Sequence, residues 1–210
     1  DEMLKLLQTG HALASVAQLK VLGLQKGIYP LLDVVVARSD EEFVKTALQD
    51  TDRRVGEDKP VAPSFLLACV LWSDVREGWN ERRIKQPPFP ALQDAIDEVF
   101  DSRIGDVSGR GKLGADMRDI WLMQPRFEKR SGSAPFTLIE QARFRAGFDF
   151  MRLRADVGEV DEALADWWQT FSLADDLGRE DLLAQLRTAT TRPHRVARAP
   201  RAVPIDASDV

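Results

Sequence analysis

Apolar residues recur at helical spacing along almost the whole chain, and glycine or proline interrupts each run after a few turns. Met3, Leu4, Leu6 and Leu7 share such spacing before Gly10, and a second run over 11–22 ends before Gly23. The valines at 34–36 are the best candidate for a strand, but one isolated strand would have no partner for its backbone. The sequence therefore predicts an all-α fold made of many short helices.

The same reasoning places the individual helices. They are expected at 1–9, 11–22, 31–36, 40–55, 63–73, 91–100, 115–123, 141–157, 159–172 and 179–187. The helix over 63–73 is apolar nearly all round, which is typical of a helix at the centre of a core. Ser39 is expected to cap the helix that follows it, and the segments 108–114 and 131–135 are expected to be loops.

Composition limits the class of protein. The chain has 210 residues and 44% hydrophobic content, enough for a core in one or two domains. No apolar run reaches the ~18 residues of a membrane span, and no secretion signal is recognisable. Cys69 lies in an apolar run, which favours a buried thiol in a reducing cytoplasm. One cysteine with His11 and His194 is too few ligands for a typical zinc site.

The net charge of −5 hides a strong segregation of charge. Residues 101–154 contain 11 basic and 7 acidic residues, and residues 187–210 contain 5 and 2. Residues 155–186, by contrast, contain 1 basic and 9 acidic residues. The acidic total excludes a uniformly basic nucleic-acid binder, whereas the basic middle segment allows local contacts with phosphate.

The motifs of catalysis are missing from the sequence. The glycine-rich segment around Lys112 resembles a phosphate-binding loop, but Leu113 stands where that loop needs serine or threonine, and no strand precedes it. Asp74, Asp97, Asp101 and Asp106 lack the convergent arrangement that Mg²⁺-dependent nucleotidyl transfer requires. We therefore expect no catalytic residue and no metal site in this chain.

The basic residues of the middle segment differ in their expected availability. Arg145, Asp149, Arg152 and Asp156 alternate in sign at helical spacing and are expected to form an exposed stripe of ion pairs. Arg143 and Arg154 lack such partners in the local sequence. The candidates for phosphate contact are accordingly Arg126, Lys129, Arg130, Arg143 and Arg154, with Arg110 and Lys112 in the glycine-rich loop. Of the adjacent Trp167 and Trp168, one is expected in the core and the other against a base or the next helix.

Four ordered stretches carry a family resemblance. They are Asp1-Glu2-Met3-Leu4-Lys5-Leu6-Leu7-Gln8-Thr9-Gly10, Asp50-Thr51-Asp52-Arg53-Arg54-Val55 with Pro63-Ser64-Phe65-Leu66-Leu67-Ala68, Met117-Arg118-Asp119-Ile120-Trp121, and Arg143-Phe144-Arg145-Ala146-Gly147-Phe148-Asp149-Phe150 followed by Trp167-Trp168 and Phe171. Together they resemble the C-terminal half of bacterial poly(A) polymerase I, a relative of the CCA-adding enzymes. The chain departs from the family at 109–112, where a proline–basic pair is common, and at 141–142, where His-Pro is common.

The resemblance implies an enzyme that adds adenylates from ATP to RNA 3′ ends with Mg²⁺. The chemistry would reside in an N-terminal head with a Gly-Ser signature followed by Asp-x-Asp, which this chain lacks in that order. The chain itself would be a fragment that holds RNA and is inactive alone. The implied domains are an RNA-binding neck over 1–38, which adds Lys5 to the RNA candidates, a helical body over 39–187 and a flexible arginine-containing tail over 188–210.

Two other functions stay open at this point. One is the C-terminal part of a CCA-adding tRNA nucleotidyltransferase. The other is a helical protein-interaction module that docks a helicase or an RNA-decay protein, which the acidic segment 155–186 and the arginines of the tail would also suit. The oligomeric state is open in each case.

Overall fold

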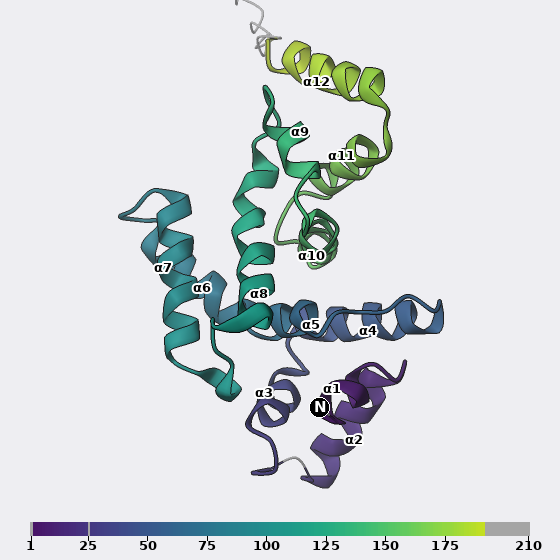
Figure 1. The fold of residues 1–210 in the computed structure, drawn as a ribbon, viewed down its shortest axis with the longest axis vertical. Coiled ribbons are helices and arrows are strands. Elements are labelled where there is room, and N and C mark those ends of the chain that lie inside the picture. The colour runs from purple at the N-terminus through teal and green to yellow at the C-terminus, as the bar shows by residue number, and fades with distance from the viewer. Residues whose placement is uncertain (1, 25, 192–210) are drawn as a thin grey trace, which may run out of the picture. The chain divides into compact units, whose positions relative to one another are not determined.

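The chain is a succession of α-helices joined by short connections, shown in Figure 1 as a computed structural model that describes residues 2–24 and 26–191. No strand occurs within these ranges, which confirms the all-α prediction. The contacts separate residues 1–173 from residues 174–210, and each unit is described by itself.

The first unit contains eleven α-helices in its described residues. They are α1 (Glu2–Leu7), α2 (Ala12–Leu22), α3 (Pro30–Arg38), α4 (Glu42–Gly56), α5 (Pro63–Val70), α6 (Trp72–Arg82), α7 (Pro88–Asp101), α8 (Gly111–Met123), α9 (Ala134–Ile139), α10 (Phe144–Asp156) and α11 (Glu162–Leu173). Two short 3₁₀ turns, η1 (Ile104–Asp106) and η2 (Gln124–Glu128), interrupt the series. The second unit contributes α12 (Asp176–Thr191).

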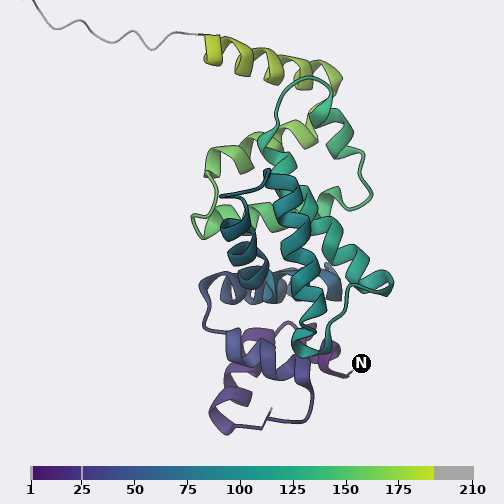
Figure 2. The same ribbon diagram turned by 90° about the vertical axis from the view of Figure 1, so that its left-hand side faces the viewer.

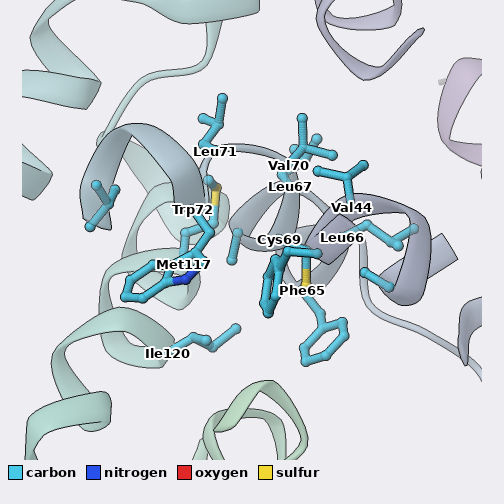
Figure 3. Close-up of a cluster of buried hydrophobic side chains, with 14 of the residues drawn as sticks. Val44, Phe65, Leu66, Leu67, Cys69, Val70, Leu71, Trp72, Met117 and Ile120 are labelled. Carbon is cyan, nitrogen blue, oxygen red and sulfur yellow. The ribbon is translucent and has the colours of Figure 1, made fainter. Parts of the chain in front are cut away.

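Helix α5 occupies the centre of the core, as its composition predicts. Every residue from Ser64 to Val70 is buried. Figure 3 shows its side chains meeting Val44 of α4 on one side and Met117 and Ile120 of α8 on another. The indole Nε1 of Trp121 in α8 donates a hydrogen bond to the carbonyl oxygen of Ala68 at 3.2 Å. A helix with no solvent-facing side needs neighbours on all its faces, and the surrounding helices supply them.

A second apolar centre consists of aromatic rings, and we call it the aromatic cluster: Phe127, Phe136, Phe144, Phe148, Trp167, Trp168 and Phe171. Trp168 is completely buried, and its Nε1 donates to the carbonyl oxygen of Phe127 at 2.8 Å. Its ring meets that of Phe127 edge to face, with the centroids 5.2 Å apart. The aromatic cluster thereby joins α11 and α10 to the turn η2.

The N-terminus of α2 is capped by a side chain of another helix, α4. Asp52 in α4 accepts hydrogen bonds from the backbone N–H groups of Ala12 at 2.6 Å and Leu13 at 3.1 Å. The first N–H groups of a helix have no partner inside that helix, and a carboxylate near them is favoured by the helix dipole. The acidic segment Asp50-Thr51-Asp52 therefore has a structural role, because Asp50 in turn pairs with Arg53 and Arg54.

Several expected helix boundaries need correction. The helix expected over 63–73 ends at Val70, and a separate helix, α6, begins at Trp72 and continues to Arg82. The helix expected over 141–157 is preceded by the short α9 and the turn η2, which the periodicity did not show. Ser39 does not cap α4, since its hydroxyl donates to the carbonyl oxygen of Val36 at the end of α3.

The glycine-rich segment is also only partly a loop. Helix α8 begins at Gly111, so the second half of the expected loop forms its first turn. A Cβ atom on Gly114 would lie 2.6 Å from Cα of Gly109 and 2.6 Å from the carbonyl oxygen of Ser108. Only glycine allows the helix to approach the preceding loop this closely.

Replacing Gly114 with alanine should lower the free energy of unfolding by about 1 to 2 kcal/mol, because the clash with backbone atoms outweighs the gain in helix propensity. Thermal denaturation would measure the change. Gly56→Ala is the matched control, since a Cβ atom at that helical glycine would meet nothing within 4 Å. Equal melting temperatures for the two variants would contradict the close approach.

Cys69 is buried, as its apolar neighbours in the sequence predict. Burial raises the pKa of its thiol well above the ordinary value.

The C-terminal part of the chain departs from the prediction. Helix α12 continues to Thr191, beyond the expected end at 187. The rest of the predicted tail, 192–210, lies outside the described residues, and the division into neck 1–38 and body 39–187 stays a prediction. None of the described helices is both long and apolar enough to cross a membrane.

Candidate nucleic-acid interface

Three of the predicted RNA contacts converge on one groove of about 890 Å³. We call it the α7–α9 groove, because its walls come from the start of α7, the end of α8, the turn η2, α9 and the connection to α10. Arg126, Lys129 and Arg143 line it, although they come from two different segments. The complete lining is Pro87, Pro88, Phe89, Asp119, Leu122, Met123, Pro125, Arg126, Lys129, Ala134, Thr137, Gln141, Ala142 and Arg143.

The basic wall of the groove is carried by η2, which the core holds in place. Phe127 is completely buried between Arg126 and Lys129, and its carbonyl oxygen accepts the Trp168 hydrogen bond. The buried side-chain amide of Gln124 donates to the carbonyl oxygen of Gly147 in α10 at 3.2 Å. These anchors direct the flanking basic side chains outward into the groove.

The opposite wall is apolar and includes an exposed aromatic ring. Helices α6 and α7 lie side by side in Figures 1 and 2, and the segment 87–89 begins α7. The indole Nε1 of Trp79 donates to the carbonyl oxygen of Pro88 at 2.8 Å and fixes this segment. Phe89 is 42% exposed, so part of its side chain is accessible to a ligand in the groove.

The basic residues around the groove differ in their ion pairs. Within the described part of the chain, Arg126 and Lys129 form none, so their charges are available to a ligand. Arg143, which has no partner in the local sequence, donates to Asp116 Oδ1 of α8 at 2.5 Å. Asp116 lies 27 residues away in the sequence, beyond the reach of a local pairing rule.

Arg154, another predicted RNA contact, is buried and already has hydrogen-bond partners. Its guanidinium donates to Glu159 Oε2 at 3.2 Å and to Gln124 Oε1 at 3.3 Å. It also lies over the ring of Trp72, 5.0 Å from the centroid. Burial lowers the pKa of the Arg154 guanidinium, while the charge of Glu159 raises it, and the net shift is downward. The partners of Arg154 thus lie outside its own helix, after the end of α10 and in η2.

The predicted stripe of ion pairs on α10 is confirmed only in part. Arg145 pairs with Asp149 at 3.1 Å, as its spacing predicts. Asp149 is buried rather than exposed, however, and also pairs with Arg54 of α4 at 2.6 Å. Arg152 pairs with Asp166 of α11 instead of the acidic residues of its own helix.

The remaining predicted contacts lie outside the lining of the groove. Arg110 and Lys112 are exposed near the start of α8, and Lys5 is exposed on α1. Arg130 lies over the ring of Trp167, 5.4 Å from its centroid. Trp168 is the tryptophan in the core, and Trp167 stacks on Phe171 with centroids 4.8 Å apart. The role of these residues in RNA binding stays a prediction.

Sequence reasoning missed the wall formed by Pro87, Pro88 and Phe89, which the pattern indicated only as a break between helices. The signal in the sequence was a phenylalanine between two prolines, Pro88-Phe89-Pro90. Among the described residues, no three histidine, cysteine, aspartate or glutamate side chains are grouped so that they could hold a metal ion.

Comparison with known proteins identifies the family of the chain. The chain matches the family described as polymerase A arginine-rich C-terminus over residues 84–202, a range that includes the whole lining of the α7–α9 groove. It is 33% identical over 211 residues to poly(A) polymerase I of Haemophilus influenzae, 30% identical over 217 residues to that of Salmonella typhi, and 29% identical over 217 residues to that of Escherichia coli O157:H7. Each alignment covers 96% of this chain and 46% of the relative, so the chain spans about half the length of these relatives. The match over more than half of its residues shows that the chain belongs to the poly(A) polymerase arginine-rich C-terminal family.

Proposed function

We propose that the chain holds single-stranded RNA in the α7–α9 groove, as the RNA-binding part of an enzyme that adds adenylates to RNA 3′ ends. The observation that carries the proposal is the pair of basic side chains, Arg126 and Lys129, that face the groove without an ion pair in the described residues. Basic side chains that already neutralise a carboxylate gain less from a phosphate than these two.

The residues that line the groove favour binding of a single strand over binding of a duplex. Lys and Arg on one wall suit phosphate oxygens, and the exposed ring of Phe89 on the other offers a surface on which an unpaired base can stack. Such contacts tolerate any base sequence, because they read the phosphate charge and the face of the base. An RNA strand that is extended at its 3′ end needs a binding site that accepts any base sequence.

In this proposal the nucleotidyl transfer, with its ATP and Mg²⁺, takes place in a catalytic head outside these 210 residues, and the chain has no polymerase activity by itself. The relatives reported above are poly(A) polymerases, which supports this assignment over a CCA-adding enzyme. Participation in mRNA processing, contacts with RNA-decay proteins and a cytoplasmic location belong to the same proposal.

Removing both unpaired basic side chains should weaken RNA binding and its dependence on salt. For the double variant Arg126→Ala/Lys129→Ala, the slope of log K against log salt concentration should become shallower by about 1.4, since each phosphate contact on single strands contributes ~0.7. Filter binding of oligo(A) across a salt series measures this slope.

The matched control is Lys45→Ala/Lys59→Ala, which removes the same charge from two exposed lysines outside the groove and outside the expected neck. Phe89→Ala tests the other wall: it should lower affinity at every salt concentration and leave the slope unchanged. No binding of the unaltered chain to RNA at low salt, or equal slopes for the two double variants, would overturn the proposal.

A further inference from the structure

A second hollow lies next to the α7–α9 groove and shares part of its lining. We call it the α4–α10 hollow; its volume is about 230 Å³. Ala142 and Arg143 line both the groove and the hollow, so the two sites share part of their walls. The lining of the hollow is Arg54, Pro60, Val61, Ala62, Phe65, Ala142, Arg143, Arg145, Ala146 and Asp149.

The combined lining is strongly basic in charge. Five basic side chains, Arg54, Arg126, Lys129, Arg143 and Arg145, line the groove and the hollow, against the two carboxylates Asp119 and Asp149. The lining of the two sites thus contains three more basic than acidic side chains, whereas the chain as a whole has a net charge of −5. A local surplus of basic side chains on an acidic protein attracts a polyanion to that surface.

The individual side chains in the hollow differ in how much they can offer a ligand. Arg54 is held between Asp50 at 2.9 Å and Asp149 at 2.6 Å, and serves mainly to position the latter. Arg145 contacts the same Asp149 at 3.1 Å but remains 73% exposed. Its donors can therefore reach a phosphate while Asp149 keeps Arg54 as a partner.

The residues shared by the groove and the hollow lie at the boundary between the two sites. Ala142 is exposed and small, so the backbone there presents no bulky side chain to separate the two sites. Arg143 stands beside it, half-buried, with its guanidinium steadied by Asp116. A positive charge at the crossing point suits a chain of regularly spaced phosphates better than two separate small ligands.

We infer that an RNA strand bound in the α7–α9 groove continues across Ala142 and Arg143 into the α4–α10 hollow, so that the two form one track for consecutive nucleotides. The inference rests on the proposed function, and it adds the route of the strand and the role of Arg145 as a phosphate contact. Arg145 was expected from the sequence to be neutralised within α10.

The first test compares Arg145→Gln with the unaltered chain over a series of oligo(A) lengths from about 3 to about 12 nucleotides, within the usual range for single-strand sites. Short oligomers that fill only the groove should bind both proteins within twofold. The longest oligomers should bind the variant about tenfold less tightly, the effect of one lost charge-assisted hydrogen bond. Lys45→Gln, an exposed lysine outside both sites, should match the unaltered chain at every length.

Failure of this inference is distinguishable from failure of the proposed function. If Arg126→Ala/Lys129→Ala weakens binding while Arg145→Gln matches the unaltered chain at all lengths, RNA binds in the groove alone and the track is wrong. If the unaltered chain binds no oligomer, both are wrong. Thermal denaturation of Arg145→Gln verifies that the variant is folded, since Asp149 retains Arg54.

Photocrosslinking gives a second measurement that does not depend on affinity. Single cysteines replacing Thr137 in the groove and Ala62 in the hollow can be labelled, because both positions are exposed and Cys69 is buried. The two labels should capture different nucleotides of one long RNA in a fixed order, and the label at residue 62 should capture only long RNA. Capture of the same nucleotides by both labels, or of short RNA at residue 62, would overturn the track.

Discussion

Replacing Trp168 with alanine should lower the free energy of unfolding by about 3–5 kcal/mol, the usual cost of removing a fully buried tryptophan. The indole packs against the rings of Phe127, Phe144 and Phe171, with centroid separations of 5.2, 6.1 and 5.7 Å. The melting temperature of a chain of this size should fall by roughly 6–20 °C. RNA affinity should fall as well, because η2 loses the hydrogen bond that anchors it beside Arg126 and Lys129.

Trp168→Phe separates the two contributions of the indole. It keeps most of the apolar contact and removes the Nε1 donor, so it should cost about 1–3 kcal/mol, the penalty of an unsatisfied buried carbonyl group plus a small loss of volume. Thermal and urea denaturation measure both variants. A cost below about 1 kcal/mol for the alanine variant would show that the aromatic cluster does not stabilise the fold.

Replacing Glu159 with alanine should be equally destabilising, by about 3–5 kcal/mol, because it leaves a buried positive charge without its carboxylate. Glu159 Oε2 accepts from Trp72 Nε1 at 2.9 Å and from Arg154 Nε at 3.2 Å, and its other oxygen pairs with Arg76. Arg76 is 43% exposed and can be solvated, whereas Arg154 is 10% exposed. Most of the cost should therefore come from Arg154.

A double-mutant cycle tests this assignment. Glu159→Leu/Arg154→Met replaces both buried charges with apolar side chains and should recover most of the stability that Glu159→Leu alone loses, since buried ion pairs are often no more stabilising than well-packed apolar groups. Chemical denaturation of the two single variants and the double variant gives the coupling energy. If the stability losses of the two single variants added up in the double variant, the cost of Glu159→Leu would come from lost packing and not from an unpaired charge on Arg154.

The parts of the fold that the sequence predicted well are those encoded in local pattern. The run from Phe65 to Val70 has no polar face, so only the centre of a helical core accommodates it, and α5 lies there. Phe148, Met151 and Ala155 recur at helical spacing on one face of α10, and all three are buried. Gly23 adopts the left-handed conformation that ends α2. Each of these signals acts within one or two helical turns.

The candidate site was predictable only in its basic residues, because its other parts depend on contacts between distant segments. Arg143 and Arg154 looked unpaired since Asp116 lies in another helix and Glu159 follows after α10 has ended. The short elements η2 and α9 contain five and six residues, so periodicity gives only a weak signal for them. Phe89 forms a wall of the groove only because α6 and α7 fold back on each other.

The capping of α2 by Asp52 also affects the order in which the chain can open. The first N–H groups of α2 are bound to a side chain on α4, 40 positions later in the sequence, rather than to a neighbouring loop. Loosening the end of α4 would release both hydrogen bonds at once and expose the first turn of α2 to solvent. The amide hydrogens of Ala12 and Leu13 should therefore exchange together with those at the end of α4, which makes the two helices one cooperative unit of local unfolding.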